Sequence, residues 1–260
     1  MSGVLERGFQ VVERLASHPE GRQLSTLASE LEIPLSATHR LLTELIRLGY
    51  VRQSSDDGQY VLTIKLVAMG LSYLSNSGIV DVAQPLLDEM AAKAGDLVRL
   101  AVVDGDDLIF VAKAQGATRG LRYDPDMGLS VPLSCSAAGH AWLSTMSDDD
   151  ALSLLAKKGI ASTGDHGPNA PKTIKDAMKF VKQARQRGYS MISDMFSPGM
   201  SAMASPIRDG AGVVIGVVTV AGPLVRLTNQ RMEQLSPHLL QTAELVARAS
   251  SASKLFKKAA

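Results

Sequence analysis

The single cysteine of the chain lies close to one of its five histidines. Cys135 precedes His140 by five residues, so a thiol and an imidazole could act as a nucleophile and its base. No obvious third group is available to orient the imidazole. A buried cysteine that fills space in a core is far commoner. A hydrolase or lyase that uses Cys135 and His140 is therefore the rival hypothesis and not the preferred one.

The sequence pattern for a metal site is weaker than that for a Cys135–His140 pair. The aspartates at 148–150 could hold a cation, but they follow Ser147 and fit the acidic first turn of a helix. His166 and His238 are solitary. One cysteine cannot form an internal disulfide or a multi-cysteine zinc or iron–sulfur site, and it fits a reducing cytoplasm. We expect neither a metal nor a cofactor.

A helical pattern over residues 35–48 places polar side chains opposite an apolar stripe of four leucines. Serine and threonine suit hydrogen bonds to phosphates or base edges, and arginine suits guanine or phosphate. The segment 24–31 would brace this helix across a DNA backbone, and an arginine in the following hairpin would reach a phosphate or the minor groove. The predicted DNA-contacting residues are Ser25, Thr26, Ser36, Thr38, His39, Arg40, Thr43, Arg47 and Arg52.

Charge alone leaves the partner of this face open. Residues 1–75 hold seven Lys or Arg and eight Asp or Glu, so this half has no broad basic patch. Residues 36–53, however, hold three arginines against Glu44 alone. A merely solvated helix face and a protein-interaction adaptor remain alternatives to DNA binding.

The elements around this face follow from periodicity and turn residues. Apolar stripes predict three helices before Gly49, and two short β-type runs flank an Asp-Gly turn at 57–58. Three helices and a hairpin in about 60 residues are typical of a winged helix-turn-helix domain, which we place at 1–63. A relatively apolar helix is predicted at 66–74, and it forms most of a linker that we place at 64–79.

Residues 80–260 alternate between strand and helix patterns. Asp-Gly pairs join successive strands into antiparallel hairpins, and helices lie to the sides, which favours an α+β domain over a doubly wound one. The predicted strands are 97–103, 108–114, 189–193, 202–207 and 213–221, and the predicted helices are 81–94, 136–146, 148–158, 173–187 and 229–250.

Small residues begin the predicted helix 136–146, in the order Ser136-Ala137-Ala138-Gly139. Small side chains let a ligand approach the backbone, and free N–H groups at a helix N-terminus favour a carboxylate. A tight contact between helix and sheet requires small residues equally. Ligand binding and packing therefore both stay open for this segment.

An ordered set of short motifs along nearly the whole chain resembles the IclR family of bacterial transcriptional regulators. The motifs are LER at 5–7, LSTLA at 24–28, IPLSATHRLL at 33–42, LGYV at 48–51, GQYVL at 58–62, VVDG at 102–105, LSCSAAG at 133–139, GY at 188–189, PG at 198–199, ASPI at 204–207 and AGP at 221–223.

The resemblance implies an N-terminal winged helix, a linker helix and a C-terminal GAF-like effector-binding domain, here 80–260. It implies dimers or dimers of dimers, a pseudo-palindromic double-stranded DNA operator and a small organic acid as the effector. It also implies that the carboxylate of the effector binds the backbone amides around Ala138 and Gly139.

The chain departs from the family pattern behind this expected pocket. Ile192 and Met195 replace a usual Asp and Glu, Ala202 stands at a Cys or Ser position, and Ala221 stands where Ser is common. Each change removes a hydrogen-bonding group, which disfavours a tiny acid such as glyoxylate and favours an aromatic or otherwise partly apolar one. The methionines between 191 and 203 either line this pocket or belong to the core. The predicted effector-binding residues are Cys135, Ser136, Ala138, Gly139, Ile192, Asp194, Met195, Ala202, Thr219 and Ala221.

Composition sets the outer limits. The chain has 260 residues, a formal net charge of +1, 45% hydrophobic and 20% charged residues, which is typical of one large or two modest globular domains. The longest nearly apolar run, 212–222, is too short to span a membrane, and the start shows no signal-peptide pattern. We therefore predict a cytoplasmic, homo-oligomeric DNA-binding regulator controlled by an organic acid, and no enzyme.

Overall fold

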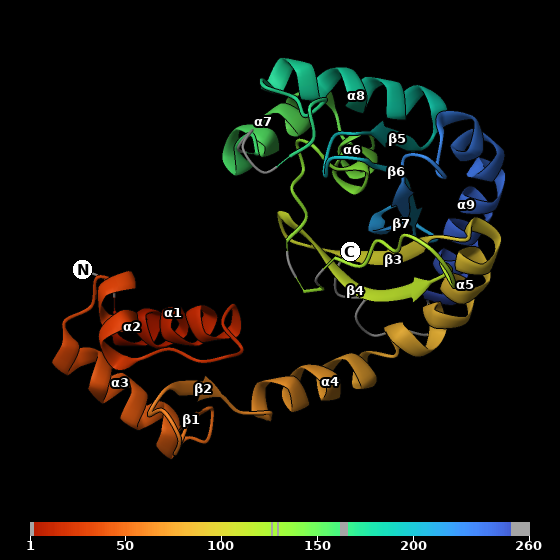
Figure 1. Cartoon of the computed structure of the whole chain (residues 1–260). Helices are drawn as coiled ribbons and strands as arrows, with labels where there is room; N and C mark the ends of the chain where they lie inside the picture. The colour runs from red at the N-terminus through yellow and green to blue at the C-terminus, as the bar shows by residue number, and fades with distance from the viewer. Residues whose placement is uncertain (1–2, 126, 129, 162–165, 251–260) are drawn as a thin grey trace. The chain divides into compact units, whose positions relative to one another are not determined.

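The computed structural model describes residues 3–125, 127–128, 130–161 and 166–250 (Figure 1). The chain divides into two compact units, residues 1–74 and 75–260. The first is helical with a small hairpin, and the second is built on one five-stranded sheet. The predicted α+β fold is thus confirmed.

The N-terminal unit is a winged helix-turn-helix. The buried faces of its helices meet at Val11, Leu15, Leu27 and Leu42, none of which is more than 2% exposed. An isolated bridge from Arg22 to Tyr60 ties the hairpin to the segment between the first two helices. The elements are α1 (Val4–Ala16), α2 (Leu24–Glu30), α3 (Leu35–Arg47), β1 (Val51–Gln53) and β2 (Tyr60–Leu62).

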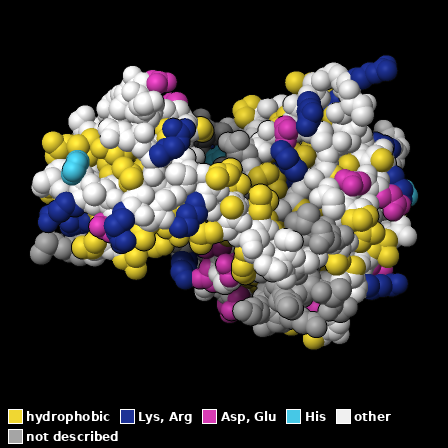
Figure 2. Space-filling model, turned by 90° about the horizontal axis from the view of Figure 1, so that it is seen from below, with side chains coloured by type: hydrophobic (Ala, Val, Ile, Leu, Met, Phe, Trp, Pro, Cys, Tyr) yellow, Lys and Arg dark blue, Asp and Glu magenta, His cyan; other side chains and the backbone are white. Residues whose placement is uncertain are grey.

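The linker helix α4 (Lys65–Ser77) is longer than the predicted 66–74. Gly78 ends it with a φ of 67°, a left-handed conformation that glycine adopts without a Cβ clash, and α5 (Ile79–Ala94) follows directly. The apolar side chains of α4 remain largely exposed in the single chain: Val67 52%, Met69 52%, Leu71 61% and Tyr73 61%. Yellow hydrophobic side chains are visible at the surface in Figure 2.

The sheet of the second unit is antiparallel throughout, in the order β4-β3-β7-β6-β5. Helices α5 and α9 (Asn229–Ser250) pack on one face, and α6 (Ala137–Leu143), with α8 (Ile174–Arg187) behind it, packs on the other (Figure 1). Helix α7 (Asp148–Lys158) contacts α8. The strands are β3 (Leu97–Asp104), β4 (Asp107–Gln115), β5 (Ser190–Ser193), β6 (Met200–Arg208) and β7 (Val214–Pro223).

Helix α6 is shorter than the predicted 136–146. The hydroxyls of Ser144 and Thr145 donate hydrogen bonds to the carbonyls of Ala141 and Trp142, and such local bonds compete with continuation of a helix. Over the described residues, no helix is long and apolar enough to cross a membrane.

Candidate DNA interface and ligand pocket

The polar face of α3 is open to solvent. Ser36, His39, Arg40, Thr43 and Arg47 are all exposed. The Thr43 hydroxyl donates to the His39 carbonyl at 2.9 Å, and Arg47 pairs with Glu44 at 2.9 Å. Within the described residues Arg40 makes no ion pair, so its guanidinium is the one on α3 without an intramolecular anion.

Thr38 does not belong to this face, and its prediction as a DNA contact is wrong. Its side chain is 0% exposed, and its hydroxyl lies 3.2 Å from the carbonyl oxygen of Pro34 and 3.4 Å from that of Ile33. Position 38 is one helical turn before buried Leu42, so both side chains face the core.

The flanking elements add exposed side chains around α3. Ser25 is exposed and Thr26 half-buried on α2, and Arg52 is exposed on β1. Lys65, which sequence analysis left out, donates to the Leu48 carbonyl at 2.7 Å and lies over the Tyr50 ring.

The second unit contains a cavity of about 490 Å³ between the sheet and the start of α6. Its wall is mostly apolar and aromatic. Six of the ten predicted effector-binding residues line it, namely Ser136, Ala138, Ile192, Ala202, Thr219 and Ala221. The other lining residues are Arg99, Phe110, Tyr123, Asp124, Pro125, Ser130, Val131, Pro132, Ala137, His166, Phe196, Met200 and Ser201.

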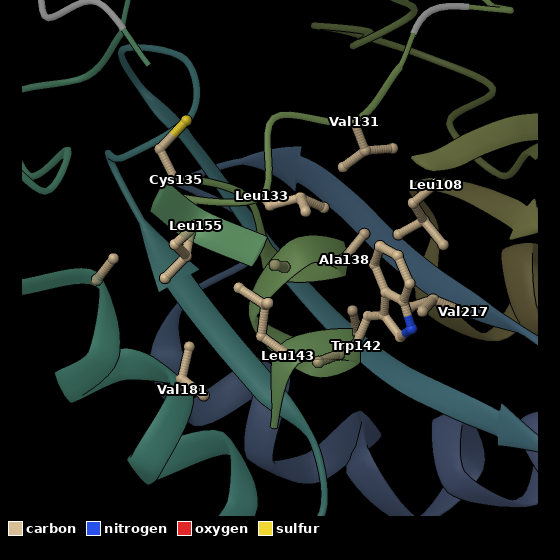
Figure 3. Close-up of a cluster of buried hydrophobic side chains, with 14 of the residues drawn as sticks. Leu108, Val131, Leu133, Cys135, Ala138, Trp142, Leu143, Leu155, Val181 and Val217 are labelled. Carbon is tan, nitrogen blue, oxygen red and sulfur yellow. The ribbon is translucent and has the colours of Figure 1, made fainter. Parts of the chain in front are cut away.

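Cys135 is not part of that wall. It is 1% exposed and belongs to the hydrophobic core of this unit, and its sulfur points away from Ala138 (Figure 3). Burial raises the pKa of its thiol to about 11. Its prediction as an effector contact is therefore wrong, because the segment turns the side chain into the core.

The thiol and imidazole also fail as a catalytic pair. His140 is fully buried, donates from Nε2 to the Ser134 carbonyl at 2.8 Å and stacks on Phe180. Burial lowers the pKa of His140 to about 4. No hydrogen bond joins this ring to Cys135 among the described residues, and the thiol stays protonated at neutral pH. This geometry removes the basis of the enzyme hypothesis.

Gly139 is a packing glycine rather than a ligand contact. A Cβ atom on it would lie 2.4 Å from the carbonyl oxygen of Leu133, and its amide already donates to the Ser136 side chain at 3.0 Å. Gly139 is also not among the residues that line the cavity, whereas its neighbour Ala138 is, so the structure does not support the expected role of Gly139.

Asp194 and Met195 also lie outside the cavity wall. Met195 is 1% exposed in the core. The Asp194 carboxylate accepts a hydrogen bond from the Gly199 amide at 2.6 Å, which closes the turn that brings Phe196 and Met200 to the cavity. Both predictions are corrected, since the turn directs these side chains elsewhere.

Sequence analysis missed a buried cation that lines the cavity, Arg99. It is 7% exposed, and its guanidinium carbon lies 3.6 Å from the centre of the Phe110 ring. Nε of Arg99 is buried and has no hydrogen-bond partner among the described residues. Burial lowers the pKa of Arg99 to about 10, so it stays charged at neutral pH. A lone arginine in the apolar run 97–103 was the signal that could have revealed it.

The segment after β4 closes one side of the cavity and is held by side chains of the sheet and of the loop before α9. Gln115 donates to the Tyr123 carbonyl at 2.9 Å, and Arg226 donates to the Leu121 carbonyl at 3.1 Å. His166 donates from Nδ1 to the Phe196 carbonyl at 2.9 Å on the other side. The cavity wall is therefore anchored by hydrogen bonds from distant parts of the chain.

A winged helix joined to a helix-covered sheet is an arrangement typical of one class of proteins, the transcriptional regulators. The family model described as "Bacterial transcriptional regulator IclR C-terminal" matches residues 71–248, and the "IclR helix-turn-helix domain" model matches residues 4–55. The chain belongs to the IclR family of bacterial transcriptional regulators.

Individual relatives agree with this assignment. The chain is 30% identical to the acetate operon repressor of Salmonella typhimurium, over 93% of this chain and 88% of that protein. It is 26% identical to the Pca regulon regulatory protein of Pseudomonas putida, over 88% of this chain and 77% of that protein. These relatives are regulators and not enzymes.

Solved structures show the same fold. An IclR regulator from Alicyclobacillus acidocaldarius matches with a TM-score of 0.81 at 20% identity, over 96% of this chain and 99% of that chain. An IclR homologue from Microbacterium hydrocarbonoxydans, complexed with 4-hydroxybenzoate, matches with a TM-score of 0.79 at 19% identity, over 96% of this chain and 100% of that chain.

Proposed function

We propose that this regulator binds a two-fold DNA operator and that a partly apolar organic acid in its cavity controls operator affinity. The observation that carries the proposal is an arginine-bearing open helix face in the same chain as a largely apolar cavity of about 490 Å³. Control requires that the acid bind the DNA-competent and DNA-incompetent arrangements with different affinity.

The DNA contact would be made by α3 in the major groove. Ser36, His39, Arg40 and Thr43 are exposed on one side of the helix, within reach of base edges and phosphates. Arg52 on β1 would reach the adjacent backbone. Arg40 is the best base-reading candidate, because Arg47 is already paired with Glu44.

A second copy of the chain would cover the exposed apolar side chains of α1 and α4. Val4 is 77%, Leu5 76% and Phe9 57% exposed on α1, and α4 adds Leu71 and Tyr73 at 61% each. Fully burying such a side chain stabilises by about 1.5–3 kcal/mol, so a dimer is favoured over an exposed patch. A two-fold dimer, or a dimer of dimers, would read a pseudo-palindromic operator.

The cavity favours an acid larger than glyoxylate. Ile192, Ala202 and Ala221 offer no side-chain hydrogen bond, and Phe110 and Phe196 offer aromatic contact. A volume of about 490 Å³ lies within the range of roughly 300–1,000 Å³ that is usual for small-molecule pockets. The homologue crystallised with 4-hydroxybenzoate supports an aromatic acid here. Such a regulator would act in the cytoplasm, where its operator lies.

Two measurements test this proposal. Fluorescence anisotropy with a fragment of the protein's own promoter should show binding that weakens as salt rises. Calorimetry should show that benzoate or 4-hydroxybenzoate binds more tightly than glyoxylate or pyruvate, by roughly ten- to a hundredfold. Tighter binding of glyoxylate or pyruvate would reject the effector class. Absence of any salt-dependent promoter binding would instead favour the protein-interaction adaptor.

A further inference from the structure

The side chain of Arg99 lies on the cavity face of the sheet. In the strand register Arg99 pairs with Thr219 of β7 and with Lys113 of β4. Thr219 lines the cavity, as does Ala221 two residues on. Because side chains alternate along a strand, the neighbours Val98 and Leu100, both 0% exposed, occupy the opposite face.

Among the described residues, no carboxylate forms an ion pair with this guanidinium. Asp124 is the nearest candidate, but its carboxylate is held by Lys113 at 2.6 Å and by Arg122 at 3.1 Å. These four groups together carry three positive charges and one negative charge. A buried cation without a hydrogen-bonded counter-ion is unfavourable, and such groups are normally paired. Within the part of the chain that the structure describes, Arg99 therefore has room for an anionic ligand as its counter-ion.

We propose that Arg99 binds the carboxylate of the effector and that the apolar body of the effector extends across the sheet toward β5. This inference rests on the proposed function, in which the cavity takes an organic acid. It places the carboxylate on a side chain of β3, not on the α6 backbone that the family resemblance implied. The Gly139 amide there is already bonded to Ser136.

The order of the strands determines in which direction a ligand bound at Arg99 can extend and how long a ligand the cavity floor can accommodate. From β3 the cavity floor continues over Thr219 and Ala221 on β7, Ala202 on β6 and Ile192 on β5. Neighbouring strands lie about 4.8 Å apart, so β3 to β5 spans roughly 14 Å. A two-carbon acid anchored at Arg99 would reach no farther than β7. A ring-bearing monocarboxylate would also contact the apolar surface of β6.

Phe110 supports the cation without neutralising it. Its ring stacks on the face of the Arg99 guanidinium, an arrangement that is favourable for a cation and fixes the guanidinium plane. The N–H groups at the edge of that plane then remain for a carboxylate, which matches the planar fork of an arginine.

The melting temperature of the ligand-free protein distinguishes a structural role of Arg99 from a ligand-binding role. If Arg99 mainly supports the sheet through Phe110, then Arg99→Met should lower the melting temperature. If Arg99 instead binds an anionic ligand, then Arg99→Met removes a buried charge that has no counter-ion in the ligand-free protein. The unbranched methionine side chain would still cover the Phe110 ring. The ligand-free variant should then melt at the wild-type temperature or above it.

The experiment compares wild type, Arg99→Met and the control Arg208→Met, which replaces an exposed arginine on β6 outside the cavity. Calorimetry uses benzoate, 4-hydroxybenzoate and phenylacetate, each beside its neutral amide. We expect Arg99→Met to weaken acid binding roughly 10- to 100-fold, to leave amide binding unchanged and not to lower the melting temperature. Arg208→Met should behave as wild type.

The outcomes separate the inference from the function on which it rests. Equal acid affinity in wild type and Arg99→Met would overturn the role of Arg99 and leave an acid-binding regulator intact. A lower melting temperature of ligand-free Arg99→Met, with Arg208→Met unchanged, would also overturn it. If none of the acids binds wild type, the proposed effector class itself fails and the inference fails with it.

Discussion

Replacing Gly139 by alanine tests whether this glycine serves packing or ligand access. A Cβ atom there would lie 2.4 Å from the Leu133 carbonyl oxygen, 2.5 Å from its Cα and 2.8 Å from its carbonyl carbon. All three are backbone atoms, so no flexible side chain can move aside. Overpacking of this kind typically lowers the free energy of unfolding by about 1–3 kcal/mol. Because rigid backbone atoms are contacted here, we expect a loss at the upper end, about 3 kcal/mol. The better helix propensity of alanine offsets up to about 1 kcal/mol.

The net loss of about 2 kcal/mol predicts a melting temperature lower by about 4–8 °C for a unit of this size. Thermal unfolding followed by circular dichroism measures it, with Gly210→Ala as the matched control. Gly210 lies in the same unit, has no heavy atom within 4 Å of an added Cβ and is not in the left-handed region. The packing argument is refuted if Gly139→Ala melts like Gly210→Ala but loses acid binding. That result would instead restore Gly139 as the point where the ligand meets the backbone.

Three further predictions concern pH, assembly and DNA. Stability of the second unit should fall as pH drops from 6.5 to about 4, because the buried His140 stays neutral in the folded protein while the unfolded chain takes up the proton earlier. His140→Gln should flatten this part of the unfolding profile, and an unchanged profile would contradict the assignment. Leu71→Asp should shift light scattering toward a 27.6 kDa monomer, whereas Leu152→Asp, at an exposed leucine of α7, should not; equal masses for both variants would reject the α4 interface. Arg40→Ala should cost about 1–3 kcal/mol of operator affinity and Arg47→Ala less, since Glu44 already pairs with Arg47. Unchanged operator binding in the folded double variant would exclude α3 as the recognition helix.

The sequence by itself determined the winged helix, the order of strands and helices and the open face of α3. Each of these depends on local periodicity and turn residues, which act within a few positions of one another. Helix α7 lies at the predicted 148–158, where Ser147 caps the acidic first turn, and α9 lies at the predicted 229–250. The apolar character of Ile192, Ala202 and Ala221 was likewise readable without a structure, since the residue types alone carry it.

Only the tertiary structure decided which small or polar side chains reach the cavity. Arg99 faces the ligand space because β3 pairs with β7, more than a hundred residues away in the chain, and that register selects the face on which it lies. Gly139 is required because α6 touches the Leu133 backbone, and nothing in its own segment distinguishes this contact from ligand access. Local patterns set the propensity of a segment, whereas the partner of a side chain depends on which distant segment packs across from it.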